Sequence, residues 1–104
     1  MANSPNIGLA LIEQSQSQKE VTLNESLLKI DALLNTSAIS TSTTSPPLNP
    51  MMGDLYIIPP VSFEEWAGKH GKLAYYDGSA WNFIAPKKGA SFFVADEEIF
   101  YFFI

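Results

Sequence analysis

The clearest pattern of apolar and polar positions is a pair of apolar runs separated by a polar turn, between residues 73 and 84. Two short apolar and aromatic runs, Leu73–Tyr76 and Trp81–Ile84, stand on either side of Asp77-Gly78-Ser79. Asp-Gly between such runs is the strongest local signal for a β-hairpin. Glycines precede the first run, and a proline and a glycine follow the second, so both strands are bounded. The pattern therefore predicts a hairpin here, around which the rest of the chain is organised.

Two further apolar runs predict more strands. Leu55–Ile58 is apolar on both faces and stops at two prolines, which is typical of a central strand covered above and below. Ser91–Ala95 and Ile99–Ile104, joined by acidic residues, form a second candidate hairpin. Its last run is apolar on both faces and would be an aggregation hazard if exposed. We therefore expect this run to be sandwiched, to pair with another chain, or to belong to a longer protein.

The first half of the chain predicts one helix. Thr22-Leu-Asn-Glu25 has the form of a capping box, so the helix should start at Thr22 and run to Asn35. Apolar residues follow at helical spacing, with polar residues, Asp31 among them, mostly on the other side. This stripe indicates either packing on the domain's own sheet or contact between copies around a symmetry axis, although two heptads are too short for a self-sufficient coiled coil. Its members are Leu23, Leu27, Ile30 and Leu34.

The remaining segments carry weaker signals. Residues 1–21 form an N-terminal arm, loose over 1–8 and extended or weakly helical over 9–20. Residues 36–52 are rich in serine, threonine and proline and read as a surface connection, either a mobile linker or one that adds an edge strand around Ile39–Thr43. The predicted class is α+β: one N-terminal amphipathic helix (22–35) packed on a mostly antiparallel sheet of four to six strands built from hairpins (53–104), in one domain.

Composition and charge exclude several function classes. The 104 residues carry a net charge of −5 and include six lysines and no arginine, so a basic surface for nucleic acid is missing. Without cysteine there are no disulfides or thiolate metal sites, and a single histidine does not make a metal site within one subunit. No apolar run is long enough for a signal core or a membrane span. We expect no metal, no cofactor, no nucleic acid and no membrane insertion.

No catalytic residues can be assigned from the sequence. Neighbouring carboxylates such as Glu64 and Glu65 point apart rather than across a cleft, so they do not match the two-carboxylate geometry of glycoside hydrolysis. His70 sits between glycines with no serine or cysteine motif to serve, and no phosphate-binding loop or nucleophile elbow is present. The sequence therefore predicts a protein that is not an enzyme.

The aromatic residues allow two interpretations. Trp66, Tyr76 and Trp81 would form a stacking platform for a host-surface glycan if their ring faces were exposed. In a small β-domain, however, tryptophans more often supply the core, because each aromatic side chain buries on the order of 200 Å². Both interpretations remain open at this stage.

Taken in order, the motifs resemble a small phage-associated domain family of uncharacterised biochemistry. That family occurs in prophages, often at the N-terminal end of tail-fibre and head-spike proteins, including those of gene transfer agents. The resemblance covers roughly residues 9–100 in unbroken order. The residues that carry it are Gln16-x-Gln-Lys19, Thr22-x-Asn-Glu25, Asp31-Ala-Leu33, Pro46-Pro47, Gly53-Asp54-x-Tyr-Ile57, Trp66-Ala-Gly68, Gly71-x-Leu-Ala74, Asp77-Gly78, Trp81-x-Phe83, Pro86, Gly89 and Val94-Ala-Asp96.

The resemblance implies a virion structural protein made in the cytoplasm of the host bacterium. It would act as an adaptor or attachment module of a tail fibre or head spike. Its partners would be its own copies in a homotrimer and other virion proteins of tail or head. The alternative is a carbohydrate-binding module on the particle surface that serves host attachment. The residues we expect at the oligomer interface are Leu23, Leu27, Ile30, Leu34, Phe100, Phe102 and Ile104.

Overall fold

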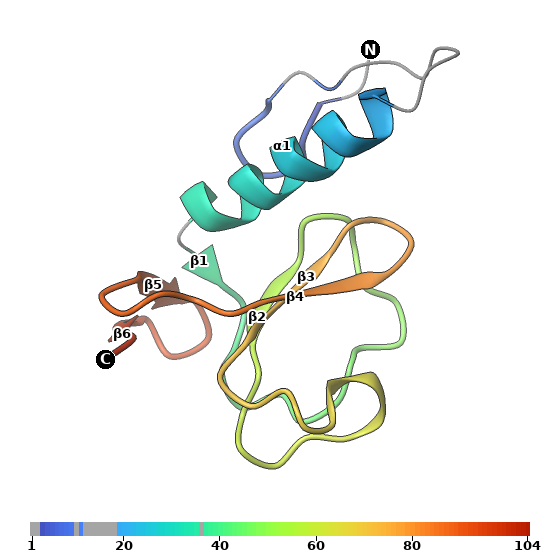
Figure 1. Ribbon diagram of the computed structural model, residues 1–104. Coiled ribbons are helices and arrows are strands. Elements are labelled where there is room, and N and C mark those ends of the chain that lie inside the picture. Colours follow the sequence, from blue (N-terminus) through green and yellow to red (C-terminus); the bar gives the residue numbers. More distant parts are fainter. Residues whose placement is uncertain (1–2, 10, 12–18, 36) are drawn as a thin grey trace. The chain divides into compact units, whose positions relative to one another are not determined.

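The computed structural model describes residues 3–9, 11, 19–35 and 37–104, with the helical side chains given for residues 24–33. The chain divides into two compact units, Met1–Asn35 and Thr36–Ile104. The first is built on a single helix, and the second contains two small sheets (Figure 1). The predicted α+β class is confirmed, but the predicted packing of the helix on a sheet of four to six strands is not.

Helix α1 spans Lys19–Asn35. Its predicted end is confirmed, whereas the predicted start at Thr22 is three residues too late. Lysine and glutamate are good helix formers, and two of the three residues before Thr22 are of these types. Thr22 therefore lies inside the helix and not at its N-terminus, where the sequence predicted it.

A buried carboxylate holds the first unit together. Asp31 is fully buried, and its Oδ1 accepts hydrogen bonds from the Ser4 hydroxyl at 2.6 Å and from the Ile7 N–H at 2.7 Å. The Asn6 N–H lies 3.1 Å from Oδ2, and the Ser4 hydroxyl oxygen accepts from the Leu9 N–H at 2.7 Å. The start of the chain, predicted to be loose, is therefore a turn fastened to the helix.

This fastening overturns the predicted orientation of the helix. Asp31 was expected on the polar side but is buried, while Ile30 of the apolar stripe is 43% exposed and Leu33 is 39% exposed. A buried charge is tolerated only when donors surround it, and the N-terminal turn supplies them. The apolar stripe alone therefore does not define which side of α1 is covered.

The first sheet contains the predicted central hairpin. Its order is β2 (Leu55–Ile57), β3 (Leu73–Tyr76) and β4 (Trp81–Ile84), all antiparallel. Tyr76 pairs with Trp81 across the turn, which confirms the hairpin. All three residues of β2 are buried, as predicted for a strand covered on both faces, although β3 and not β2 is the middle strand.

The second sheet contains the second predicted hairpin. Here β1 (Ser37–Ala38) pairs in parallel with β5 (Ser91–Val94), and β5 pairs antiparallel with β6 (Ile99–Phe102). The six strands therefore form two sheets of three rather than the predicted single sheet of four to six. The edge strand was expected around residues 39–43, but β1 lies just before them and no strand is formed at residues 39–43.

The short stretch after β1 joins the two sheets. The Ile39 N–H donates to the Leu55 carbonyl at 2.7 Å, and the Ala38 carbonyl accepts from the Ala95 N–H at 2.8 Å. One residue further on, the Ser40 carbonyl accepts from the Ile57 N–H. This stretch makes backbone hydrogen bonds to β2 on one side and to the end of β5 on the other. Ser40 is itself buried, so the predicted connection is built into the core at this point rather than being a surface linker.

The core of the second unit is an aromatic cluster on one face of the first sheet. Trp66 is fully buried, and its ring centre lies 5.3 Å from those of both Tyr56 and Trp81. Ile58 and Ala74 complete the buried set. Edge-to-face and tilted ring pairs of this kind add stability beyond the area they bury. The core interpretation of the two tryptophans is therefore confirmed.

The turn of the central hairpin is organised by Asp77. Its Oδ1 accepts from the Ser79 and Ala80 N–H groups at 2.9 and 2.8 Å, and its Oδ2 accepts from the Asn82 side-chain amide at 2.9 Å. Burial by itself raises the pKa of Asp77, but the hydrogen bonds from Asn82, Ala80 and Ser79 outweigh it and hold the pKa below its ordinary value. Gly78, at φ +103°, provides the left-handed backbone that the turn needs.

We predict that Asp77→Asn destabilises the second unit and removes part of its acid sensitivity. A carboxylate whose pKa is lowered on folding contributes stability above its ordinary pKa of about 4, and this is lost as pH falls through the lower folded value. Because Asp77 is partly exposed, solvent screening limits the loss to about 1 kcal/mol. Thermal melting from pH 7 to pH 3 measures it. Asp96→Asn, in the other hairpin turn, is the control, because it removes the same charge and leaves the hydrogen bonds of Asp77 intact.

Candidate functional site

The most unusual surface of the second unit is the apolar strand β6 and its continuation. Phe100 is 63% exposed, Phe102 is 67% exposed, and Ile104 is fully exposed. Ile99, at the start of the strand, is 49% exposed. Phe100, Phe102 and Ile104 alternate with Ile99 along the chain, so these three share the outer face, where they present on the order of 400 Å² of apolar area, a size that in monomeric proteins often marks a binding site. We refer to these three residues as the β6 surface.

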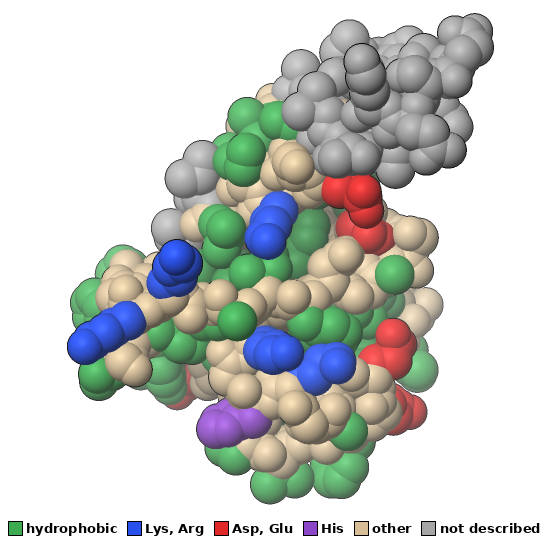
Figure 2. All heavy atoms as spheres, viewed as in Figure 1, with side chains coloured by type: hydrophobic (Ala, Val, Ile, Leu, Met, Phe, Trp, Pro, Cys, Tyr) green, Lys and Arg blue, Asp and Glu red, His purple; other side chains and the backbone are tan. Residues whose placement is uncertain are grey.

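The pairing of β5 with β6 explains why this surface is apolar on the outside. Phe92 and Val94 of β5 are buried and point to the inner face of the hairpin. Phe93 and Phe100, which are register partners with ring centres 5.3 Å apart, lie on the outer face. Figure 2 shows hydrophobic side chains at the surface where Figure 1 places this hairpin. The hairpin therefore has one apolar face in the core and a second one in solvent.

The outer edge of β6 is open in the described part of the chain, because β6 is the last strand in the order β1-β5-β6. The Phe103 N–H donates to the Ala90 carbonyl, on the β5 side. Since N–H and carbonyl groups alternate in direction along an antiparallel strand, those of Phe100 and Phe102 point away from β5. An open edge of this kind is a template for another strand.

A small hollow lies beside the β6 surface. It has a volume of about 280 Å³, and Phe102, Tyr101, Pro59, Pro60 and His70 are among the residues that line it. Its walls are mostly apolar, so it suits an apolar side chain of a partner. His70 is exposed at this rim, and no described serine or cysteine accompanies it there.

The predicted interface residues of the helix are less informative. Ile30 is exposed, and Leu27 is half-buried. The side chains of Leu23 and Leu34 lie outside the described residues. The two groups of predicted interface residues belong to different compact units, so each is treated as a surface of its own unit.

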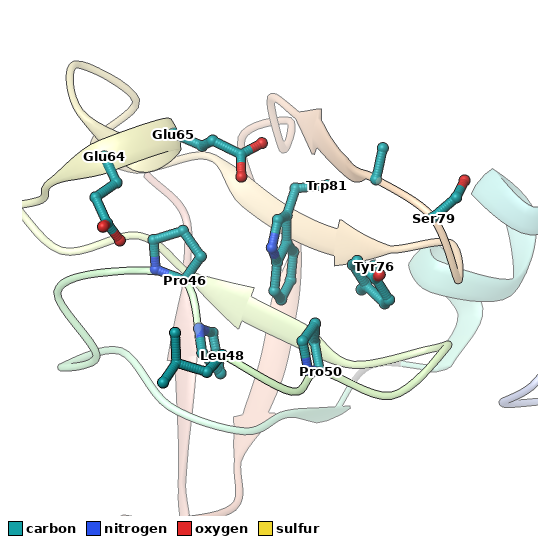
Figure 3. A pocket seen from close by; sticks show the side chains of 10 residues that line it. Pro46, Leu48, Pro50, Glu64, Glu65, Tyr76, Ser79 and Trp81 are labelled. Carbon is teal, nitrogen blue, oxygen red and sulfur yellow. The ribbon is translucent and has the colours of Figure 1, made fainter.

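A groove of about 420 Å³ lies on another part of the second unit. In Figure 3, Pro46, Leu48 and Pro50 lie along one side of it, with the indole of Trp81 across from them and the side chains of Glu64 and Glu65 at one end. The residues that line the groove are Pro46, Pro47, Leu48, Pro50, Glu64, Glu65, Tyr76, Ser79, Ala80 and Trp81.

The three residues predicted as a glycan platform are placed differently from one another. Tyr76 and Trp81 both line the groove, with ring centres 5.1 Å apart. Trp66 is in the core with no exposed area. Trp81 itself is only 9% exposed and presents little of its ring face. The flat, exposed platform of three rings that the sequence suggested is therefore not formed, because two of the rings are used for packing.

Sequence reasoning missed both walls of the groove. Residues 46–50 read as part of a surface connection, although prolines next to an exposed leucine suggest a stiff apolar wall. Glu64 and Glu65 were set aside as solvated charges. Glu64 has a left-handed backbone with φ +56°, which is unusual for a residue other than glycine, and it begins the short 3₁₀ helix Glu64–Trp66. That helix carries Trp66 into the core and leaves both carboxylates at the groove.

Neither a metal site nor a membrane-spanning helix is found among the described residues. No group of three histidine, aspartate or glutamate side chains among them is placed to hold a metal ion. Among the same residues, no helix has the length and apolar character needed to cross a membrane.

The comparisons with known proteins give a family but no activity. Residues 23–104 match the family described as "Protein of unknown function (DUF2793)", and the chain belongs to this family. The match covers all of the second unit and most of α1. Neither the curated proteins nor the solved structures contain a match.

Proposed function

We propose that this DUF2793 protein is an assembly module of a phage or phage-derived particle, acting without catalysis by associating with copies of itself and with other virion proteins. The β6 surface is the observation that carries the proposal, because it combines exposed apolar side chains with an open strand edge. The resemblance described above supports a place in a tail fibre or head spike and a homotrimeric state. It also supports synthesis in the host cytoplasm before incorporation into the virion.

The free energy gained by burying apolar area favours an assembly in which the β6 surface is removed from water. Burying apolar area contributes roughly 25 cal/mol per Å², so covering this surface in each copy would contribute on the order of 10 kcal/mol before the costs of association. The open backbone groups of β6 would gain hydrogen bonds in the same event. Around a three-fold axis, the outer face with Phe93, Phe100 and Phe102 would meet its copies and form a shared core.

The charges at the two ends of the hairpin favour a copy of the chain as the partner. Asp96, Glu97 and Glu98 lie in the turn before β6, and Lys87 and Lys88 precede β5 at the opposite end. In a three-fold ring each contact joins different patches of neighbouring copies, so the acidic end of one hairpin would lie near the basic end of the next. Such complementarity favours the correct partner and speeds the encounter.

The test is the solution mass of the wild-type protein and of Phe100→Lys/Phe102→Lys, measured by light scattering coupled to size exclusion over a concentration series. We expect a trimer for the wild type and a monomer for the double variant, because lysine charges would have to be desolvated in the interface. Phe63→Lys is the matched control, since Phe63 is also 55% exposed but lies outside β6. It should remain trimeric.

Two results would argue against this assignment. A wild-type protein that stays monomeric at high concentration would leave the β6 surface without a role in self-association. A double variant that assembles at wild-type yield would show that the subunit contact lies outside the β6 surface. Leu27→Asp and Ile30→Asp then test the helix as the alternative interface, since a charge at either position would abolish an assembly made by α1.

A further inference from the structure

The hollow beside the β6 surface has two walls, which come from different sheets. One wall is the stretch after β2 together with the loop before β3, where the Gly71 N–H donates to the Ile58 carbonyl at 3.0 Å. The other wall is the end of β6, residues 101–103. The hollow measures about 280 Å³, and an apolar cavity of about 150 Å³ already binds benzene, so one aromatic ring fits into it.

The hydroxyl groups at the hollow are already engaged within the chain, which favours an apolar occupant. The Thr41 and Tyr101 hydroxyls both donate to the Glu97 carboxylate, at 2.9 and 2.8 Å. Each hydroxyl has a single proton to donate, so neither is left to donate to a sugar or a peptide group. Apart from His70 at the rim, the other lining residues are apolar side chains and one glycine. An apolar side chain would therefore fill this space without leaving a polar group unpaired.

The hollow borders the surface for which we propose self-association. Phe102 belongs to the β6 surface and also lines the hollow. A standard interface covers about 800 Å² of each partner, roughly twice the area of the β6 surface, so a stable contact has to extend onto its surroundings. In a closed ring, each copy also needs two different patches, one for each neighbour. The β6 surface and the hollow are two such patches, with Phe102 between them.

Phe100 is the side chain best suited to the hollow of a neighbouring copy. It is 63% exposed, is not among the residues that line the hollow of its own copy, and lies against Phe93 with ring centres 5.3 Å apart. A ring that is already held in place loses little freedom on binding. The acidic turn 96–98 precedes Phe100, whereas the loop 69–72, which forms part of the hollow, contains two lysines and no acidic residue. This complementarity favours a copy of the chain as the occupant.

From these observations we infer that Phe100 of one copy inserts into the hollow of the next, so that the copies are joined head to tail. The inference rests on the proposed self-association and adds which two surfaces meet. Each contact then uses one ring and one hollow, and three such contacts close a ring. The competing arrangement is a symmetric one, in which the Phe100 side chains of all copies meet on the axis and the hollows stay empty.

Two variants that each lack one half of the contact test this inference. Phe100→Glu removes the ring and keeps the hollow, whereas Pro60→Glu/His70→Glu keeps the ring and places two carboxylates at the hollow. The three substituted side chains are exposed, so both variants should fold. We expect each variant alone to be monomeric by light scattering, because a carboxylate would have to lose its water in the contact. Mixed in equal amounts, they should form a heterodimer with a Kd below about 1 mM, because one intact ring meets one intact hollow.

NMR locates the contact in this mixture. The Gly71 amide signal of isotope-labelled Phe100→Glu should shift when the unlabelled hollow variant is added, because Gly71 lines the hollow. Val61→Glu/Phe63→Glu is the matched control. It adds the same charges at exposed positions close by in the chain, and neither position lines the hollow. The control should remain trimeric, as the wild type is expected to be.

The possible results separate this inference from the proposed function. If the wild type is a trimer but the hollow variant also assembles, self-association stands and the insertion of Phe100 is wrong. The same conclusion follows if both variants are monomeric and their mixture gives no heterodimer at about 1 mM, which is the result expected for the symmetric arrangement. A wild-type protein that remains monomeric would overturn both the insertion and the self-association on which it rests.

Discussion

Replacing Trp66 with alanine is expected to unfold the second unit or leave it barely stable. The indole is fully buried between Tyr56 and Trp81, and truncating a buried tryptophan costs about 3 to 5 kcal/mol. The total stability of a unit of this size is of order 3 to 10 kcal/mol. Urea unfolding followed by the fluorescence of the remaining Trp81 measures the loss. The ring contacts of Trp81 would change as well, so its emission should move toward that of an exposed indole.

Trp66→Phe is the informative companion to this variant. The Trp66 indole N–H is buried without a hydrogen-bond partner in the described part of the structure. Such a group destabilises the fold by about 1 to 3 kcal/mol, and phenylalanine removes it while keeping one ring of the cluster. The gain offsets much of the lost packing, so we expect a cost below about 1.5 kcal/mol. A loss for Trp66→Phe as large as that for Trp66→Ala would contradict this and would mean that the N–H has a partner.

The local elements of the second unit were predictable because their signals are local. Asp77-Gly78 between two apolar runs specifies a hairpin, and the acidic turn before Ile99 specifies another. The division into two sheets was not predictable, because it depends on where residues 38–40 place their hydrogen bonds. A sequence pattern shows that a strand exists but does not show which strands it pairs with. The individual hairpins were therefore predicted correctly, whereas their grouping into a single sheet of four to six strands was wrong.

The two candidate sites also differ in how well the sequence predicts them. The apolar run Phe100–Ile104 stands out in the sequence, and its exposure is a property of one strand. The groove is assembled from three segments that lie far apart along the chain, and the residues that give it charge have no signal of their own. Only the left-handed backbone of Glu64 distinguishes this position, and that is a property of the fold.

The buried side of α1 was unpredictable for a similar reason. A lone aspartate opposite a leucine stripe reads as a solvated residue, and this is its usual role. Here Ser4, Asn6 and Ile7, at least 24 positions away in the sequence, supply the donors that make burial possible. In the sequence, nothing near Asp31 points to the N-terminal turn, and nothing in the N-terminal turn points to Asp31.

Asp31→Ala is accordingly expected to release the N-terminal turn from the helix. The N–H groups of Asn6 and Ile7 and the Ser4 hydroxyl would each lose a charged acceptor, at a combined cost of about 2 to 4 kcal/mol. Amide hydrogen exchange followed by NMR measures the release at individual residues. Ile7 and Leu9 should lose their protection together, because Leu9 donates to the Ser4 hydroxyl that Asp31 holds in place.

Asp31→Asn and Ser4→Ala separate the steps of this release. Asparagine keeps one acceptor oxygen but turns an amide toward the turn, so protection at Ile7 should fall to an intermediate level. Ser4→Ala removes the acceptor of Leu9 and leaves the bond from Ile7 to Asp31, so protection should be lost at Leu9 first. Unfolding reported by Trp66 and Trp81, both in the second unit, should keep its midpoint in all three variants. Unchanged exchange at Ile7 in Asp31→Ala would show that the turn is held by other contacts, and the buried carboxylate would then lose its structural role.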